Sequence, residues 1–241
     1  MLRADVDRFW SRFFGLDARD LRRAGVRVVS DAPGLPGYRG VFLLRLDDGC
    51  TIGAPGDVAG RVRSRADAAD VDTVFTRDGA RALVAEDAAL VLGPSIHAYV
   101  DPRGVVEQPP CDARPLGPSD DDVLARLHAA VDDDEWGEGG FARQAPYAEV
   151  VWGAFEDGDL VAAGNLTDFD GRPADVGIVT RPDSRGRGLA SRLVSMMVAD
   201  ALRTVPVVRY RALESNAASR RVAAKLGFVP DGANIAVRLS A

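Results

Sequence analysis

Hydrophobic positions in the first half of the chain change from helical to strand spacing. Apolar residues within Leu2–Gly15 fall on one broad helical face, and the glycine predicts the end of that helix. Asp17 is a suitable N-cap for a second short helix that ends near Ala24. Two apolar runs around Asp47–Gly49 predict a β-hairpin. The other elements expected in this half are helices over Asp57–Ser64 and Asp67–Thr76 and strands over Ala88–Leu92 and Ala98–Val100.

The second half alternates short apolar runs with segments of helical spacing. Two strand-like runs around Glu156–Asp159 predict another hairpin, and Val176–Val179 has the pattern of a buried strand. A mixed sheet with helices packed on it is therefore expected. Its elements, in order, are a strand at Ala113–Leu116, a helix to Val131, strands at Glu149–Phe155, Leu160–Thr167 and Val176–Val179, a helix from Gly188 to Arg203, a strand at Val205–Leu213, a helix at Ala217–Leu226 and a closing strand pair at Phe228-Val229 and Ile235–Leu239.

The proline-rich segment Gly104–Pro118 is the natural linker between the halves. We therefore expect a small α+β domain over residues 1–112, followed by a second domain over residues 113–241. The first domain carries no motif to which chemistry can be assigned. We expect it either to brace the second domain or to form an oligomer interface, as in a homodimer.

The segment Val176–Ala190 combines a strand, a glycine-rich turn and the start of a helix. Pro182 ends the strand in an extended turn, and Gly186 and Gly188 follow it, each preceded by an arginine. Glycines let backbone N–H groups point inward, and the helix N-terminus adds partial positive charge. The segment therefore predicts a site for a phosphate or pyrophosphate group.

Composition and charge exclude several classes of protein. The net charge is −6 over 241 residues, which argues against binding to nucleic acid or to an anionic membrane. Cys50 and Cys111 are far apart and lack the spacing of a metal site or a disulfide framework. No long apolar stretch resembles a membrane span or a signal peptide. We expect a cytoplasmic protein without a metal.

An acidic run interrupted by aromatic residues extends from Asp132 to Phe141. One reading is a solvated loop or helix start, because runs of acidic residues usually are solvated. The other is a wall that attracts a cationic amine, with the aromatic rings lining a pocket. The candidate substrate-binding residues on this second reading are Glu135, Trp136, Glu138 and Phe141.

Two motifs on successive βα units resemble those of the GCN5-related N-acetyltransferase (GNAT) superfamily. Arg185, Gly188 and Ala190 match its R-x-x-G-x-A signature directly after a strand. Asn216-x-x-Ser219, followed by Ala224–Phe228, is similar to its last helix and the strand after it. The order of elements over residues 113–241 agrees as well. The resemblance implies a GNAT-like acyl-CoA N-acyltransferase fold, with a mixed α+β sheet flanked by helices, and transfer of an acetyl group from acetyl-CoA to a primary amine on a small molecule or peptide.

The resemblance also implies how acetyl-CoA is held. Backbone groups of Ile178, Val179 and Thr180 would bind the pantetheine arm, and Asn216 matches a position that commonly contacts it. The pyrophosphate would rest on the N–H groups of Arg185, Gly186, Arg187, Gly188, Leu189 and Ala190.

The acid and base are less defined by the motif. Asp175 stands where relatives often place a carboxylate, although a turn-capping aspartate fits the same position, and Glu214 and Glu138 are further candidates for the base. Many relatives carry a tyrosine seven residues after the asparagine as proton donor. This chain has Ala223 there, so Ser219 is the candidate donor, and a plain residue of the first helical turn is the other reading.

Three other functions are consistent with part of the sequence. Gly186-x-Gly188 approximates a dinucleotide-binding turn, with Glu214 as the acidic residue that follows the next strand. However, six residues separate Val179 from Gly186, and only one βαβ unit is present. An RNA-binding reading of Arg-Gly-Arg-Gly is weaker, because the motif is single and the protein acidic. A non-catalytic acyl-CoA sensor or scaffold is the alternative that keeps the phosphate site.

Overall fold

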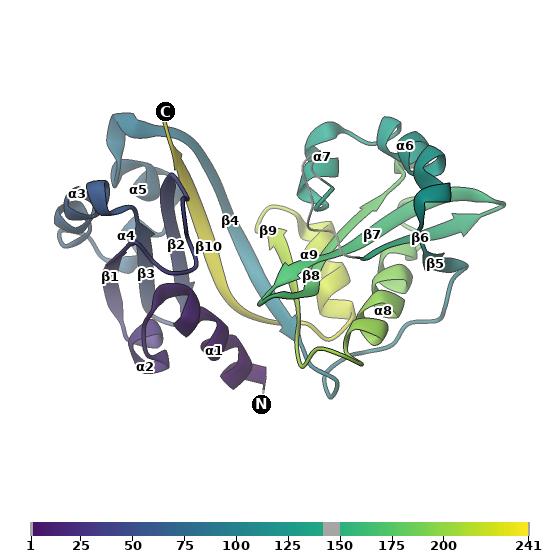
Figure 1. Ribbon diagram of the computed structural model, residues 1–241, viewed down its shortest axis with the longest axis horizontal. Coiled ribbons are helices and arrows are strands. Elements are labelled where there is room, and N and C mark those ends of the chain that lie inside the picture. The colour runs from purple at the N-terminus through teal and green to yellow at the C-terminus, as the bar shows by residue number, and fades with distance from the viewer. Residues whose placement is uncertain (1, 142–149, 241) are drawn as a thin grey trace. The chain divides into compact units, whose positions relative to one another are not determined.

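The computed structural model describes residues 2–141 and 150–240 (Figure 1). The chain forms two compact units. The first comprises residues 1–97, 212–216 and 230–241, and the second comprises residues 98–211 and 217–229.

This division differs from a single boundary near residue 112. Residues 98–112 belong to the second unit, and the C-terminal strand belongs to the first. The reason is that strand β10 (Val229–Leu239) pairs antiparallel with β2 (Gly40–Leu46), far away in the sequence. The closing strand pair expected at Phe228-Val229 and Ile235–Leu239 is thus one continuous strand from Val229.

The first unit has the strand order β1-β3-β2-β10-β4. The predicted hairpin is present as β2 and β3, and β1, which was not predicted, runs parallel to β3. The two strands expected around Gly93 form the single strand β4, whose last three residues, Ala98–Val100, belong to the second unit. The elements not yet bounded are β1 (Gly25–Ser30), β3 (Gly49–Ala54), β4 (Ala88–Val100), α1 (Leu2–Phe14), α2 (Ala18–Arg22), α3 (Gly56–Ala66), α4 (Val71–Val74), α5 (Arg77–Ala82) and the 3-10 turn η1 (Ala85–Asp87).

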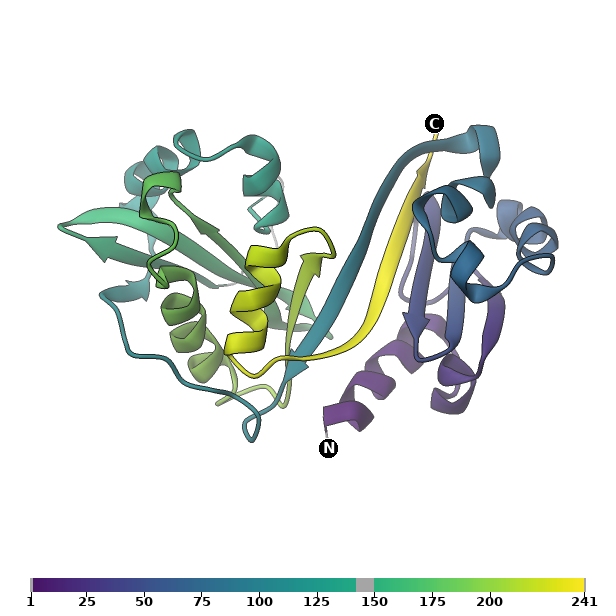
Figure 2. The same cartoon turned by 180° about the vertical axis from the view of Figure 1, so that it is seen from behind.

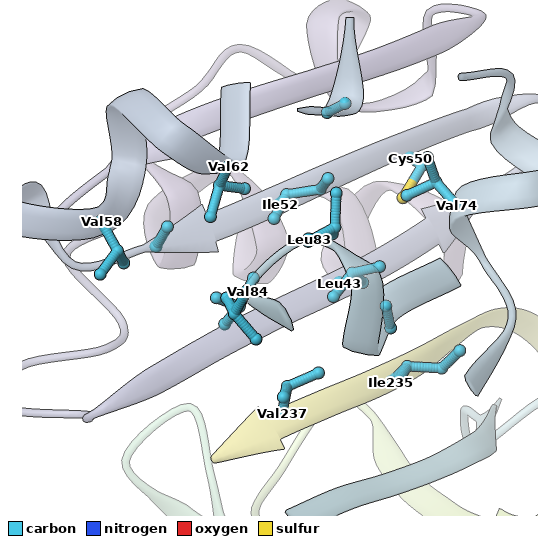
Figure 3. Packing of buried hydrophobic residues seen from close by; sticks show 14 of the residues in the cluster. Leu43, Cys50, Ile52, Val58, Val62, Val74, Leu83, Val84, Ile235 and Val237 are labelled. Carbon is cyan, nitrogen blue, oxygen red and sulfur yellow. The ribbon is translucent and has the colours of Figure 1, made fainter. Parts of the chain in front are cut away.

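Both faces of this first sheet are covered. On one face, Val62 of α3, Val74 of α4 and Leu83, directly after α5, form a core with Leu43 of β2 and Ile52 of β3 (Figure 3). On the other face lie the aromatic residues of α1, where Trp10 stacks on Phe42 with ring centroids 6.1 Å apart. Burial of these apolar side chains is the main stabilising contribution to the unit.

The second unit has the strand order β9-β8-β7-β6-β5, with the end of β4 beyond β9. The hairpin β6–β7 and the strand β8 were predicted, and β8 is parallel to β9 whereas β5–β8 are antiparallel. The elements are β5 (Ala113–Pro115), β6 (Val150–Glu156), β7 (Asp159–Phe169), β8 (Arg172–Thr180), β9 (Val208–Leu213), α6 (Asp121–Ala129), α7 (Asp133–Glu138), α8 (Leu189–Ala201), α9 (Ala217–Lys225) and the 3-10 turns η2 (Pro118–Asp120) and η3 (Pro182–Ser184).

Helices cover this second sheet on both faces. Helices α6 and α7 lie on one face and α8 lies on the other (Figure 1), and Figure 2 shows α8 and α9 side by side. Close packing requires glycine on each face: a Cβ at Gly164 would lie 2.4 Å from the sulfur of Met197, and a Cβ at Gly139 would lie 2.4 Å from Val179. No helix in residues 2–141 and 150–240 is long and apolar enough to cross a membrane.

Candidate functional site

Strands β8 and β9 are paired over a short distance only. Their parallel register joins Asp175 with Arg209 and Val176 with Tyr210. On its other side β8 stays paired with β7 as far as Thr180. In the described part of the chain, the β9 side of Gly177–Thr180 therefore lies beyond the strand register, and its backbone groups need other partners. These residues include Ile178, Val179 and Thr180, which were predicted to hold a pantetheine arm.

The loop between β8 and α8 leaves open space at its glycines. Gly186 and Gly188 have φ values of +77° and +79°, a conformation that favours glycine, and a Cβ built at either would have no atom of residues 2–141 or 150–240 within 4 Å. Gly188 is the N-cap of α8, and no side chain in the described ranges caps this end of the helix. The first N–H groups of the helix have no partner within it. The loop can therefore offer backbone donors to an anion.

The two arginines of this loop are held by weak surface contacts. Arg185 donates to the carbonyl oxygen of Thr180 at 3.1 Å and forms an ion pair with Glu135 at 2.7 Å. Arg187 forms an ion pair with Glu156. Exposed pairs of this kind contribute only about 0–1 kcal/mol. Both guanidinium groups can therefore exchange their carboxylate partners for phosphate oxygens at little cost.

Asp175 lies at the point where β8 and β9 are still paired. Its carboxylate accepts hydrogen bonds from Arg209 Nε and Nη2 at 2.9 and 2.8 Å and from Arg211 Nε at 3.1 Å. The side chain of Asp175 is only 4% exposed and that of Arg209 10%. The guanidinium of Arg209 also lies 4.5 Å from the ring centroid of Phe169. The carboxylate oxygens are thus occupied by arginines from the neighbouring strand.

The charge on Arg209 is stabilised by this arrangement. Burial by itself would lower the pKa of Arg209, but the adjacent Asp175 carboxylate outweighs it and the pKa of Arg209 is raised. Arg209 therefore stays charged at neutral pH, and its contact with Asp175 links β9 to β8.

The predicted proton donor Ser219 lies in the first turn of α9. Its Oγ is 3.0 Å from the hydroxyl of Tyr210 on β9. Burial raises the pKa of Tyr210 to about 12, although the hydrogen bond with Ser219 acts in the opposite direction. Tyr210 was not singled out in the sequence, because a tyrosine within an apolar strand normally indicates core packing. Asn216 and Glu214 belong to the first unit. The backbone N–H of Asn216 donates to Leu213 O at 2.9 Å, and the backbone N–H of Glu214 donates to Pro94 O at 2.9 Å.

The aromatic residues of the predicted acceptor wall are buried. Trp136 and Phe141 are 7% and 9% exposed and pack in one apolar cluster with Leu127, Leu160 and Val179. The ring of Trp136 stacks on His128 with centroids 4.3 Å apart. The two rings therefore do not line an open pocket. They pack between α7 and the sheet, where their apolar surface is removed from water, and so hold α7 in place.

The acidic residues of the same segment face solvent. Glu135 is engaged with Arg185, whereas none of the described residues forms an ion pair with the Glu138 carboxylate. The pKa of Glu138 is raised, first because nearby protein atoms remove part of its hydration although it is exposed, and then by the negative charges of Asp134 and Glu135. Glu138 therefore binds a proton more readily than an ordinary glutamate.

Asn165 of β7 was missed by the sequence reasoning. It is completely buried opposite Gly177 of β8, and its Nδ2 donates to the carbonyl oxygen of Gly139 at 3.2 Å. The only sequence signal is a pair of glycines within otherwise apolar strands, Gly164 and Gly177, which indicates close approach of another backbone. Gly177 meets this expectation, because a Cβ there would lie 2.0 Å from Gly139 O.

Comparison with known proteins identifies the family. A family model described as an acetyltransferase (GNAT) domain matches residues 81–229. A GNAT-family acetyltransferase from Novosphingobium aromaticivorans superimposes with a TM-score of 0.50 at 25% identity, over 64% of this chain and 67% of that one. A protein from Drosophila superimposes with a TM-score of 0.50 at 16% identity, over 67% of this chain and 57% of the other. The search of curated proteins returned no match. The predicted fold class is confirmed.

Proposed function

Because the chain belongs to the GNAT acetyltransferase family, we propose that it transfers the acetyl group of acetyl-CoA to a primary amine. The observation that carries this proposal is the strand–loop–helix unit β8–α8. Its open glycine loop and uncapped helix start fit a pyrophosphate, and the unpaired side of β8 fits an extended arm that needs backbone partners.

The residues proposed to hold acetyl-CoA are those that the family motif implies, and this geometry supports them. The pyrophosphate would accept hydrogen bonds from the N–H groups of residues 185–190, with Arg185 and Arg187 pairing with its oxygens. Ile178, Val179 and Thr180 would bind the pantetheine amides through their backbone. Asn216 remains a proposed contact of the arm on the strength of the family motif alone.

The reaction needs a base for the amine and a proton for the departing sulfur. The lone pair of the neutral amine attacks the thioester carbonyl carbon, the N–C bond forms and the C–S bond breaks. One amine proton passes to the base, and the sulfur takes up a proton to give the free thiol. Ser219 is the proposed donor. Tyr210, which stays protonated at neutral pH, can restore the proton of Ser219 through their hydrogen bond.

The base proposed here is Glu138 in place of Asp175. Asp175 is buried and its oxygens are held by two arginines. Glu138 is exposed, its pKa is raised, and it directly precedes Gly139, which packs on β8. A general base works best when its pKa approaches the working pH, so the direction of the shift supports this role.

Replacement of Gly188 tests the binding of acetyl-CoA. Gly188→Glu places a carboxylate in the open space of the loop, and we expect acetyl-CoA to bind at least about tenfold more weakly, which corresponds to about 1.4 kcal/mol. Isothermal titration calorimetry measures the change. Gly171→Glu is the matched control, because Gly171 has a φ of +74° and equally open space but lies in the β7–β8 turn. Equal affinity in the two variants, or no binding to the wild-type protein at millimolar acetyl-CoA, would refute the proposal.

A non-catalytic acyl-CoA sensor is the second candidate. It is favoured by Ala223, which replaces the tyrosine of many relatives, and by the engagement of Asp175 with arginines. A sensor would bind acetyl-CoA without turnover. Release of free CoA thiol over a broad panel of amines distinguishes the two functions, because only an acetyltransferase releases the thiol in proportion to the amine consumed.

A further inference from the structure

On the face of the sheet that α7 covers, one buried amide oxygen has no hydrogen-bond donor among the described residues. Asn165 is completely buried, and its Nδ2 donates to Gly139 O at 3.2 Å. A carbonyl oxygen can only accept, so the nitrogen must be the atom that faces Gly139. The orientation of the amide is thereby determined, and Oδ1 faces away from that bond. Among residues 2–141 and 150–240, nothing donates a hydrogen bond to Oδ1.

Such an atom costs stability unless it is used. A buried acceptor without a donor loses its hydrogen bonds to water and gains nothing in return. Most positions of β7 around it are apolar and buried, so a leucine or valine would fit the pattern of the strand. The bond from Nδ2 to Gly139 O explains one half of the amide, and the other half, Oδ1, is left able to accept from a group outside the described residues.

The surroundings of Oδ1 consist of glycine backbone. A Cβ at Gly177 would lie 2.3 Å from Oδ1, and a Cβ at Gly140 would lie 2.9 Å from it. Gly177 is the cross-strand partner of Asn165 and directly precedes Ile178, where the site proposed for the pantetheine arm begins. Gly140 is two residues from Glu138, the proposed base. The oxygen thus lies against two backbone positions, one of which directly precedes the proposed pantetheine strand and the other of which closely follows the proposed base in the sequence.

We propose that Asn165 Oδ1 accepts a hydrogen bond from the acceptor amine and so selects primary amines. This inference rests on the proposed acetyltransferase function. A neutral primary amine has a lone pair and two N–H bonds. The lone pair attacks the thioester carbonyl, one N–H proton passes to Glu138, and the other N–H bond donates to Asn165 Oδ1 throughout. A secondary amine has one N–H bond, so it cannot satisfy the base and Asn165 at the same time.

Removal of the amide tests the assignment through discrimination between substrates. Asn165→Leu keeps the approximate volume and removes the accepting oxygen. We expect kcat/KM for a primary alkylamine to fall by about 10–100-fold, the effect of losing one hydrogen bond in a buried site. The wild-type preference for this amine over its N-methyl derivative should fall by a similar factor. The Kd of acetyl-CoA, measured by calorimetry, should not change.

Two variants serve as controls. Thr167→Val removes a hydroxyl from the same face of β7, where Thr167 Oγ1 donates to Asp175 O at 3.4 Å, and should leave the preference between amines intact. Asn165→Asp is expected to be protonated in its buried position, to donate to Gly139 O through its hydroxyl and to keep Oδ1 as acceptor. It should therefore retain the preference, and it replaces the leucine variant as the test if that variant does not fold.

The outcomes separate this inference from the function on which it rests. The role of Asn165 alone would be overturned if Asn165→Leu kept the wild-type kcat/KM and the wild-type preference between amines. It would also be overturned if a folded Asn165→Asp lost that preference. Binding of acetyl-CoA by the wild-type protein with no turnover of any primary amine would overturn both. A fall in kcat/KM of Asn165→Leu that is larger for the primary amine than for its N-methyl derivative, at unchanged acetyl-CoA affinity, supports both the acetyltransferase function and the role of Asn165.

Discussion

The Asp175→Asn variant should be less stable than the wild-type protein by about 3–5 kcal/mol, the cost of removing one partner from a buried ion pair. The neutral amide takes the nearest negative charge away from Arg209, whose side chain is only 10% exposed, and cannot accept all the hydrogen bonds that the carboxylate accepts. Urea unfolding followed by tryptophan fluorescence measures the loss, because Trp136 and Trp152 both lie in the second unit.

The effect should be specific to the buried pair. Asp200→Asn, on α8, removes the same charge from an exposed pair with Arg203, where the N–O distance is 3.7 Å. That change should alter the free energy of unfolding by less than about 1 kcal/mol. An Asp175→Asn variant no less stable than Asp200→Asn would mean that the ion pair does not hold β8 and β9 together.

The same variant also bears on the site. Asp175 and Val176 are the residues of β8 in register with β9, and the part of β8 proposed to bind the pantetheine arm follows immediately. Loosening of this pair should therefore raise hydrogen exchange of the β8 amides and weaken acetyl-CoA binding. If Asp175 has only this structural role, the variant keeps the acidic limb of the wild-type pH–rate profile.

Local sequence patterns were sufficient where structure is determined locally. Pro182 and the glycines after it define a strand end, a loop and a helix start within a few residues, and α8 begins at Leu189, one residue after the expected position. The hairpin β2–β3 likewise follows from its turn residues. The fold class could be predicted because these units occur in the order typical of the family.

Pairing between distant segments could not be predicted from local patterns. Strand β10 pairs with β2, which lies far earlier in the sequence. The residues around Gly232 therefore give no local sign that the strand continues through this glycine. The role of Trp136 depends in the same way on Leu160 and Val179, which α7 meets only in the folded unit. Asn165 is an ordinary polar residue in the sequence. The role proposed for it rests on the absence of a donor for Oδ1 among the described residues, which only the structure reveals.

The Glu138→Gln variant should lower kcat by about 10²–10⁴-fold if Glu138 is the general base. A base acts in its deprotonated form, so activity falls as the pH drops through its pKa. Since partial loss of hydration and the charges of Asp134 and Glu135 raise the pKa of Glu138, this acidic limb should lie at higher pH than for an ordinary glutamate. Measurement of kcat/KM against pH with a primary amine should show the limb in the wild-type protein and its absence in Glu138→Gln.

Asp134→Asn is the matched control for this assignment. It removes a neighbouring charge from the same helix and leaves the proposed base in place, so the limb should move to lower pH without a large loss of kcat. Such a shift distinguishes titration of Glu138 from titration of the amine, whose pKa does not depend on α7. A Glu138→Gln variant that retains both the rate and the limb would exclude Glu138. Loss of the acidic limb in a stably folded Asp175→Asn would instead identify Asp175 as the general base. Arg209 and Arg211 would then set the pKa of the Asp175 carboxylate as well as link β8 to β9.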